Sequence, residues 1–357
     1  MFNPARLELA LKRRRYTARS LCELAKITPV TLSRIMNGRQ SPEPETVRRV
    51  ATVLDYPEAF FEGADIDPID VSAASFRSLK AMTAKERDAA IAAGSLSYLM
   101  TDWVKGKYDL PTADLLDLHH ERDPAGAARA LRQYWAMGEN PVGNMLNLLE
   151  TKGMRVFSLA ENTKNVDAFS CWRNDEPYVF LNTFKSTERS RFDAAHEICH
   201  LILHKHGGPK QGRNAETEAN EFASAFLMPH ADVVATIPYV TSLLDIISAK
   251  KRWGVSALAL AYRLHKMGTI TDWQYRTFCI QLNRKFPRQE PDGLPPERSS
   301  VWQMVLTDLW KQGISRNHIA SELCLPHAEV ENLLFGLTGS VGPPIVPAGR
   351  PVLKSVT

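Results

Sequence analysis

Residues 195–200 read Ala-His-Glu-Ile-Cys-His and lie within a run, 186–204, that has the pattern of an amphipathic helix. Residues four apart share one face of a helix, so His196 and His200 can present two imidazoles to one metal ion. Glu197 lies beside them, where its carboxylate can act as general base toward a water on that ion. Ser186 is a suitable N-cap for the helix. The stretch therefore predicts a metal-binding helix around which the fold is built.

A third ligand is expected on a second helix. A catalytic zinc usually takes three protein ligands and keeps a fourth position for water. Residues 216–227 have a helical pattern that ends before Pro229. Glu216 and Glu218 lie on opposite edges of its apolar stripe, so both are candidates for the third ligand. Glu218 lies somewhat further out, so the positions favour Glu216 but leave the choice open. Asn220 shares the side of Glu216 and could hold a ligand in place by a hydrogen bond.

The two motifs together resemble the ImmA/IrrE family of zinc metallopeptidases over about residues 154–263. The residues that carry the resemblance are His196, Glu197, His200, Glu216, Ala219, Asn220, Phe222, Ala223, Leu227, Met228 and Pro229. The resemblance implies one Zn²⁺ per chain on His196, His200 and Glu216, with Glu197 as the catalytic residue. Cys199 stands where the family often has glycine, and a small buried side chain is favoured there over a thiol near the metal.

Composition sets limits on the class of protein. The chain has 357 residues, 44% of them hydrophobic, which is enough for two or three domains with their own cores. The five cysteines are scattered and odd in number, which favours a reducing cytoplasm over a disulfide framework. No apolar run approaches the roughly 18 residues that a membrane span needs, and no signal peptide is evident. We expect a soluble, cytoplasmic protein.

Positive charge is concentrated at the N-terminus. Residues 1–56 carry 11 Lys/Arg against 5 Asp/Glu, a balance of +6, whereas the whole chain is +4. Such a basic segment is typical of a nucleic-acid-binding domain. Helical patterns at 18–25 and 29–36, capped by Thr17 and Thr28, flank a tight turn at Lys26 and predict a helix-turn-helix. The cationic run 12–15 is expected to be a solvated helix end.

Residues 6–54 resemble the Xre-type DNA-binding domain of phage repressors, with Ser33-Arg34-Ile35-Met36-Asn37-Gly38 at the centre. The resemblance implies DNA contacts from the recognition helix and its ends, namely from Thr28, Pro29, Val30, Thr31, Arg34, Asn37 and Arg39. Lys26 stands where the family usually has glycine, and lysine adopts a positive φ at some cost. A helical bundle that binds protein is the alternative. Domains of this type usually bind two-fold sites, so a homodimer is also considered.

The rest of the chain completes the predicted plan: mainly α with a small β-sheet, that is, an α+β zincin-like core between all-α regions. Short strands are expected at Met154–Ala160, Ala168–Arg173 and Tyr178–Asn182, the last two joined across 174–177. Leu258 and Trp273 are expected in the core. A helix expected at 327–335 bears Glu329 and has no Lys or Arg, so it would repel phosphates. We therefore expect this helix to pack within the protein or to form a dimer contact, and not to bind DNA. The expected domains are a helix-turn-helix domain (1–64), a linking region (65–153), a peptidase core (154–245), a helical region (246–337) and a disordered tail (338–357).

Three functions fit these observations. The first is a DNA-binding regulator with an active zinc endopeptidase; members of the resembled family cut repressor proteins in prophage and stress responses. Its partners would be a double-stranded DNA operator and a protein substrate, either a separate repressor or the N-terminal domain itself. The second is a regulator whose metal domain is a non-catalytic sensor or scaffold, although such a site does not need Glu197. The third is a peptidase whose N-terminal domain docks protein, which the +6 charge disfavours.

Overall fold

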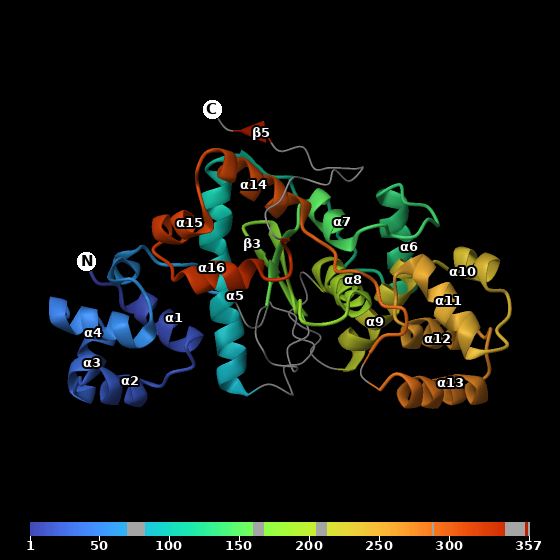
Figure 1. The fold of residues 1–357 in the computed structure, drawn as a ribbon, viewed down its shortest axis with the longest axis horizontal. Coiled ribbons are helices and arrows are strands. Elements are labelled where there is room, and N and C mark those ends of the chain that lie inside the picture. Colours follow the sequence, from blue (N-terminus) through green and yellow to red (C-terminus); the bar gives the residue numbers. More distant parts are fainter. Residues whose placement is uncertain (70–82, 160–167, 205–212, 288, 340–353, 356–357) are drawn as a thin grey trace.

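The computed structural model describes residues 1–69, 83–159, 168–204, 213–287, 289–339 and 354–355. A small helical domain lies at one end and the long helix α5 stands beside it. A sheet and the helices that carry the metal motif lie on the other side of α5 (Figure 1). Further helices lie at the far end. The described elements are mostly helices around one three-stranded sheet and a short two-stranded pair, so the predicted fold class is confirmed.

The N-terminal domain forms the expected bundle. Its elements are α1 (Pro4–Arg13), α2 (Ala18–Ala25), α3 (Pro29–Met36), α4 (Pro44–Leu54) and the 3-10 helix η1 (Glu58–Glu62). Thr17 and Thr28 cap α2 and α3 by accepting hydrogen bonds from the backbone N–H of Ser20 and Thr31. Lys26 ends α2 with φ 54°, the left-handed conformation that disfavours lysine by about 1 kcal/mol. The helix-turn-helix prediction is therefore confirmed.

The central sheet contains β2 (Arg155–Ser158), β4 (Glu176–Leu181) and β3 (Ala168–Arg173), in that order. β2 runs parallel to β4, and β3 runs antiparallel to it. The predicted 174–177 turn is wrong in extent: only Asn174 and Asp175 turn, with φ 48° and 61°. Two positive φ values are what a tight two-residue hairpin requires. Pro177 instead lies in β4, opposite Trp172.

The sheet lies between α5 (Ala84–Lys105) and α8 (Thr187–Leu203). Side chains alternate between the two faces of a strand, and on β3 Phe169 contacts α5 while Ser170 contacts α8. Gly94 of α5 allows this close packing, because a Cβ there would lie 2.4 Å from Ile69 Cδ1 and 3.2 Å from Phe169 Cζ. One edge strand, β2, packs against α7 (Met145–Thr151) and α16 (His327–Leu334). The other edge strand, β3, lies beside α8.

Helices make up most of the remaining described chain. α6 (Pro124–Tyr134) packs on α9 (Arg213–Leu227), and α10 to α13 form the cluster at the right of Figure 1. The bounds of the others are α10 His230–Thr236, α11 Leu243–Trp253, α12 Ala257–Lys266, α13 Asp272–Lys285, α14 Ser300–Lys311 and α15 Arg316–Glu322. The core prediction is wrong for Leu258 and Trp273, which are 48% and 74% exposed. Both side chains lie on the outward faces of their helices. That a residue is apolar does not by itself show whether it faces the core or the solvent.

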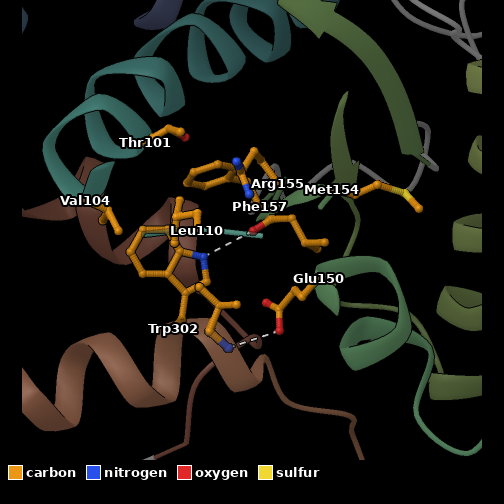
Figure 2. Close-up of a pocket in the computed structure, with 10 residues that line it drawn as sticks. Thr101, Val104, Leu110, Glu150, Met154, Arg155, Phe157 and Trp302 are labelled. Carbon is orange, nitrogen blue, oxygen red and sulfur yellow. Dashed lines mark hydrogen bonds between the residues drawn. The ribbon is translucent and has the colours of Figure 1, made fainter. Parts of the chain in front are cut away.

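A small cavity lies between α5, α7, β2 and α14 (Figure 2). Its volume is about 20 Å³, room for about one water molecule. The buried carboxylate of Glu150 in its wall accepts hydrogen bonds from the Ser299 hydroxyl and from the N–H groups of Ser300 and Val301. Burial raises the pKa of Glu150 to about 7, whereas these three donors favour the ionised form. Glu150 thus caps the start of α14, and we assign the cavity a structural role.

The N-terminal domain docks on the rest of the chain through α1. This helix packs against α5, and its C-terminal end reaches α16. The carboxylate of Glu329, fully buried, accepts hydrogen bonds from Arg13 Nε and Arg14 Nη1, each at 2.8 Å. The expected solvated helix end is therefore wrong for these two arginines. The packing role expected for the 327–335 helix is confirmed.

We expect Arg13→Ala to lower the free energy of unfolding by about 1.5–3 kcal/mol. The variant removes a charge-assisted hydrogen bond to a buried carboxylate, which costs more than an exposed pair. Arg19→Ala is the matched control, because Arg19 pairs with Glu23 in solvent and its loss should change stability by at most about 0.5 kcal/mol. Urea unfolding of both variants measures the difference. Equal stabilities would contradict a docking role for Arg13.

A short strand near the C-terminus pairs with a strand that follows α5. β1 (Tyr108–Asp109) pairs antiparallel with β5 (Lys354–Ser355), so at these two residues the structure differs from the expected disordered tail. Residues 340–353 and 356–357 of that tail lie outside the described residues.

Among the described helices, none combines the length and the apolar character needed to cross a membrane.

Candidate metal centre and nucleic-acid interface

The helix predicted to carry the metal motif is α8. Ser186 is its N-cap, accepting a hydrogen bond from the N–H of Arg189, and His204 is its C-cap residue. The expected bounds, 186–204, are confirmed. His196 and Glu197 are fully buried and His200 nearly so, because α8 is enclosed between the sheet and α9. The motif therefore lies inside the protein, at the junction of two layers.

Three side chains from α8 and α9 converge on one point. His196 Nε2 lies 3.1 Å from His200 Nε2 and 3.3 Å from Glu216 Oε2, and His200 Nε2 lies 3.8 Å from Glu216 Oε1. Zinc–ligand bonds of 2.0–2.1 Å at the tetrahedral angle place two ligand atoms about 3.3–3.4 Å apart. The two separations from His196 Nε2 are close to that value, and the 3.8 Å separation between His200 Nε2 and Glu216 Oε1 is somewhat longer. These residues form a group that could hold a metal ion.

The protonation of the two histidines also fits a cation. His196 Nδ1 lies 3.2 Å from the Asn220 carbonyl oxygen Oδ1, so Nδ1 carries the proton and Nε2 faces the group with a lone pair. Burial, and then the neighbouring His196 and His204, lower the pKa of His200 well below its usual value and keep the ring neutral. The His196 lone pair, the neutral His200 ring and a carboxylate thus face one another, and all three could bind a cation at their centre.

The structure separates the two candidate acids of α9. Glu216 belongs to the group of three, as the resemblance implied. Glu218 instead accepts a hydrogen bond from His204, with 3.0 Å between Oε2 and Nε2. Asn220 contacts His196, with 3.2 Å between Oδ1 and Nδ1. Spacing along α9 alone left the choice open, because it does not show where the histidines of α8 lie.

Glu197 has a partner that sequence reasoning missed. Ser170, in the middle of β3, donates a hydrogen bond from Oγ to Glu197 Oε2 at 2.7 Å. The only local signal was a polar residue at a buried position of a strand, flanked by Phe169 and Cys171. Cys199 is fully buried, and burial raises the pKa of its thiol well above the usual value. Its prediction as a small buried side chain is confirmed.

The residues expected to contact DNA lie on α3 and at its two ends. Val30 is 61% exposed, Thr31 is partly exposed, and Thr28, Arg34, Asn37 and Arg39 are exposed. Within this set Thr28 and Thr31 share a hydrogen bond at 2.8 Å, and Asn37 donates to the Ser33 carbonyl. An exposed apolar residue and an arginine on one short helix could contact base edges, the apolar side chain at a thymine methyl group and the arginine at a guanine.

Other arginines of the N-terminal domain serve its own structure. Arg6 donates to the Ala64 carbonyl, and Arg49 donates to the carbonyls of Ala25 and Lys26 at the turn. Arg34 and Arg39, by contrast, have no ion-pair partner within the part of the chain that the structure describes. Some of the positive charges behind the +6 balance of this segment therefore form hydrogen bonds within the protein. Arg34 and Arg39 are available to contact phosphates or bases.

Two family models match the chain. Residues 149–265 match the IrrE N-terminal-like domain of the peptidase M78 family. Residues 5–60 match a helix-turn-helix domain. Both resemblances noted in the sequence are thereby confirmed, and the matched ranges contain the residues singled out above. No curated protein matches the chain at a significant level.

Proposed function

We propose, from a chain that joins a helix-turn-helix domain to an IrrE N-terminal-like peptidase domain, that this protein is a sequence-specific DNA-binding regulator carrying a zinc-dependent endopeptidase. The observation that supports the enzymatic part most directly is the convergence of His196, His200 and Glu216, whose ligand atoms lie 3.1–3.8 Å apart. One zinc ion per chain would be held there. The direct test is zinc analysis of the purified protein, combined with the carboxylate variants described below.

The proposed chemistry assigns each side chain one task. When bound, zinc supplies a Lewis acid that lowers the pKa of a water to about 7. Glu197 then takes the proton of the attacking water and later passes it to the leaving amine of the peptide bond. The Ser170 hydroxyl orients the Glu197 carboxylate through their 2.7 Å hydrogen bond. Asn220 fixes the ring of His196 through Nδ1.

A protein substrate fits this arrangement better than a small molecule. β3 is an edge strand and lies beside α8, so an extended peptide can add to it as a further strand. Backbone hydrogen bonds would then hold a peptide bond next to the metal-motif helix. We propose a regulatory protein as the substrate, in a stress or prophage-type response, because a DNA-binding domain and a peptidase in one chain place cleavage under the control of a regulator.

We expect Arg34→Ala to weaken binding to a selected operator by about 1–3 kcal/mol, roughly 5- to 150-fold, and to relax its sequence preference. Arg34 is exposed on α3 and has no ion-pair partner among the described residues. The operator can be selected from random duplexes with the intact protein. Arg39→Ala should weaken binding to all sequences alike, as expected for a phosphate contact.

Arg276→Ala is the control for charge, because Arg276 is equally cationic, exposed and far from the N-terminal domain on α13. It should leave DNA binding unchanged. Binding is measured over a range of salt concentrations, since phosphate contacts make it salt-dependent. Failure of the intact protein to bind any duplex in a salt-sensitive way would rule out the regulatory part of the proposal.

A further inference from the structure

His204, at the C-terminal end of α8, links the metal centre to α9. Its Nδ1 lies 2.9 Å from Nδ1 of His200, one helical turn earlier, and its Nε2 lies 3.0 Å from Glu218 Oε2. The His204 side chain is 11% exposed. Three polar side chains therefore form a continuous hydrogen-bonded chain that starts at a ring whose other nitrogen faces the ligand group.

Only one arrangement of protons satisfies this chain when His200 uses Nε2 as a ligand. His200 must then carry its proton on Nδ1 and donate it to His204. His204 Nδ1 must accept, so His204 carries its proton on Nε2 and donates it to the Glu218 carboxylate. Each neutral imidazole has one donor and one acceptor, and the order Glu218–His204–His200 uses all of them.

We infer that His204 and Glu218 are positioning residues of the metal centre, which fix the tautomer and ring orientation of His200. The inference rests on the proposed function only in that the group binds a metal. Hydrogen bonds behind a metal-bound histidine commonly have this role. His196 has its own partner in Asn220, so each histidine of the group is held through Nδ1.

α9 supplies all of these contacts from one short segment. Glu216 reaches the ligand group, Glu218 reaches His204, and Asn220 reaches His196. Three polar residues at alternate positions thus contact three histidines: Glu216 lies near His196 and His200, Asn220 contacts His196, and Glu218 contacts His204. This explains why Glu218, a candidate ligand by sequence, is absent from the ligand group: its carboxylate is engaged at the end of the hydrogen-bonded chain.

The test measures zinc affinity of the full-length protein by competition with a chromophoric chelator. His204→Ala and Glu218→Ala should each weaken zinc binding about 10- to 100-fold. The double variant should be no weaker than His204→Ala alone, because loss of His204 already disconnects Glu218. Glu218→Gln should retain most of the affinity, since an amide oxygen still accepts the His204 proton.

Matched controls are Glu221→Ala, also on α9, and His230→Ala, an exposed histidine on α10. Both should bind zinc as the wild type does. Thermal unfolding of the metal-free variants separates positioning from folding: His204→Ala should lose zinc affinity while its metal-free form unfolds near the wild-type temperature. A loss of stability in the metal-free form with unchanged zinc affinity would mean that the contact is structural.

Two outcomes would overturn the inference while leaving the proposed function intact. One is a wild type that binds zinc and a His204→Ala variant whose zinc affinity is within about twofold of it. The other is a His204→Ala variant that loses zinc as completely as His200→Ala, which would make His204 a ligand. A wild type that binds no zinc would instead refute the proposed function and the inference together.

Discussion

Glu197→Gln is expected to keep zinc and DNA binding but to lower peptide-bond cleavage by a factor of about 100 or more. Glutamine has the size of glutamate and can still accept the hydrogen bond from the Ser170 hydroxyl, so the buried environment of residue 197 is preserved. It cannot take a proton from water. The variant therefore removes the general base without removing a proposed metal ligand, because Glu197 is not in the group of three.

Cleavage can be measured in cells without knowing the substrate. Cells producing the wild type or Glu197→Gln are treated with a DNA-damaging agent and compared for new protein N-termini. A fragment of a regulatory protein that only the wild type generates identifies the substrate, and self-cleavage would appear as a cut between the N-terminal domain and Met154. If Glu197→Gln matches the wild type in every comparison while zinc loss abolishes regulation, the metal domain is a sensor and not a peptidase.

The second large effect is expected at Glu216. Glu216→Gln should lower zinc affinity by at least about 100-fold, since apparent zinc-binding energies of about 10–16 kcal/mol shared among four ligands leave roughly 3 kcal/mol for each. A neutral amide is a poor replacement for a carboxylate ligand. His196→Ala should have a comparable effect. Wild-type protein should contain about one zinc per chain by elemental analysis.

The same substitution at Glu218 is the sharpest control. Glu216→Gln and Glu218→Gln change two carboxylates on one helix, two residues apart and similarly exposed. The first should lose zinc, whereas the second should keep most of it, because an amide replaces a hydrogen-bond acceptor better than it replaces a metal ligand. The reverse ranking would show that Glu218 is the ligand, and no loss in either variant would mean that zinc does not bind at this group.

Local chemistry explains which elements could be predicted from the sequence. The helices α2 and α3 match their predicted bounds, because Thr17, Thr28 and Pro29 mark their beginnings within the chain itself. Ser186 marks the start of α8 in the same way. His196 and His200 could be paired because four residues make one turn of a helix. These predictions needed no knowledge of distant contacts.

The missed features all depend on residues far apart in the chain. Ser170 meets Glu197 only because β3 packs on α8, and Glu329 meets Arg13 only because α16 packs beside α5 and α1. Neither pairing leaves a local pattern. The exposure of Trp273 on α13 was also not predicted. An amphipathic pattern shows that one face of a helix is apolar, but a single tryptophan does not show which face packs against the rest of the protein. Packing between elements decided each case.

The carboxylate of Glu329 is synthesised long after the arginines that it binds. Arg13 and Glu329 are 316 residues apart, which corresponds to roughly 16–63 s of translation at about 5–20 residues per second. The N-terminal domain has its own helix caps and its own buried apolar side chains, such as Leu21, Leu32 and Leu54, and can form well before that. On the ribosome, Arg13 and Arg14 therefore lack this partner. The nascent domain presents two more cations to surrounding nucleic acid than the same domain does in the finished protein.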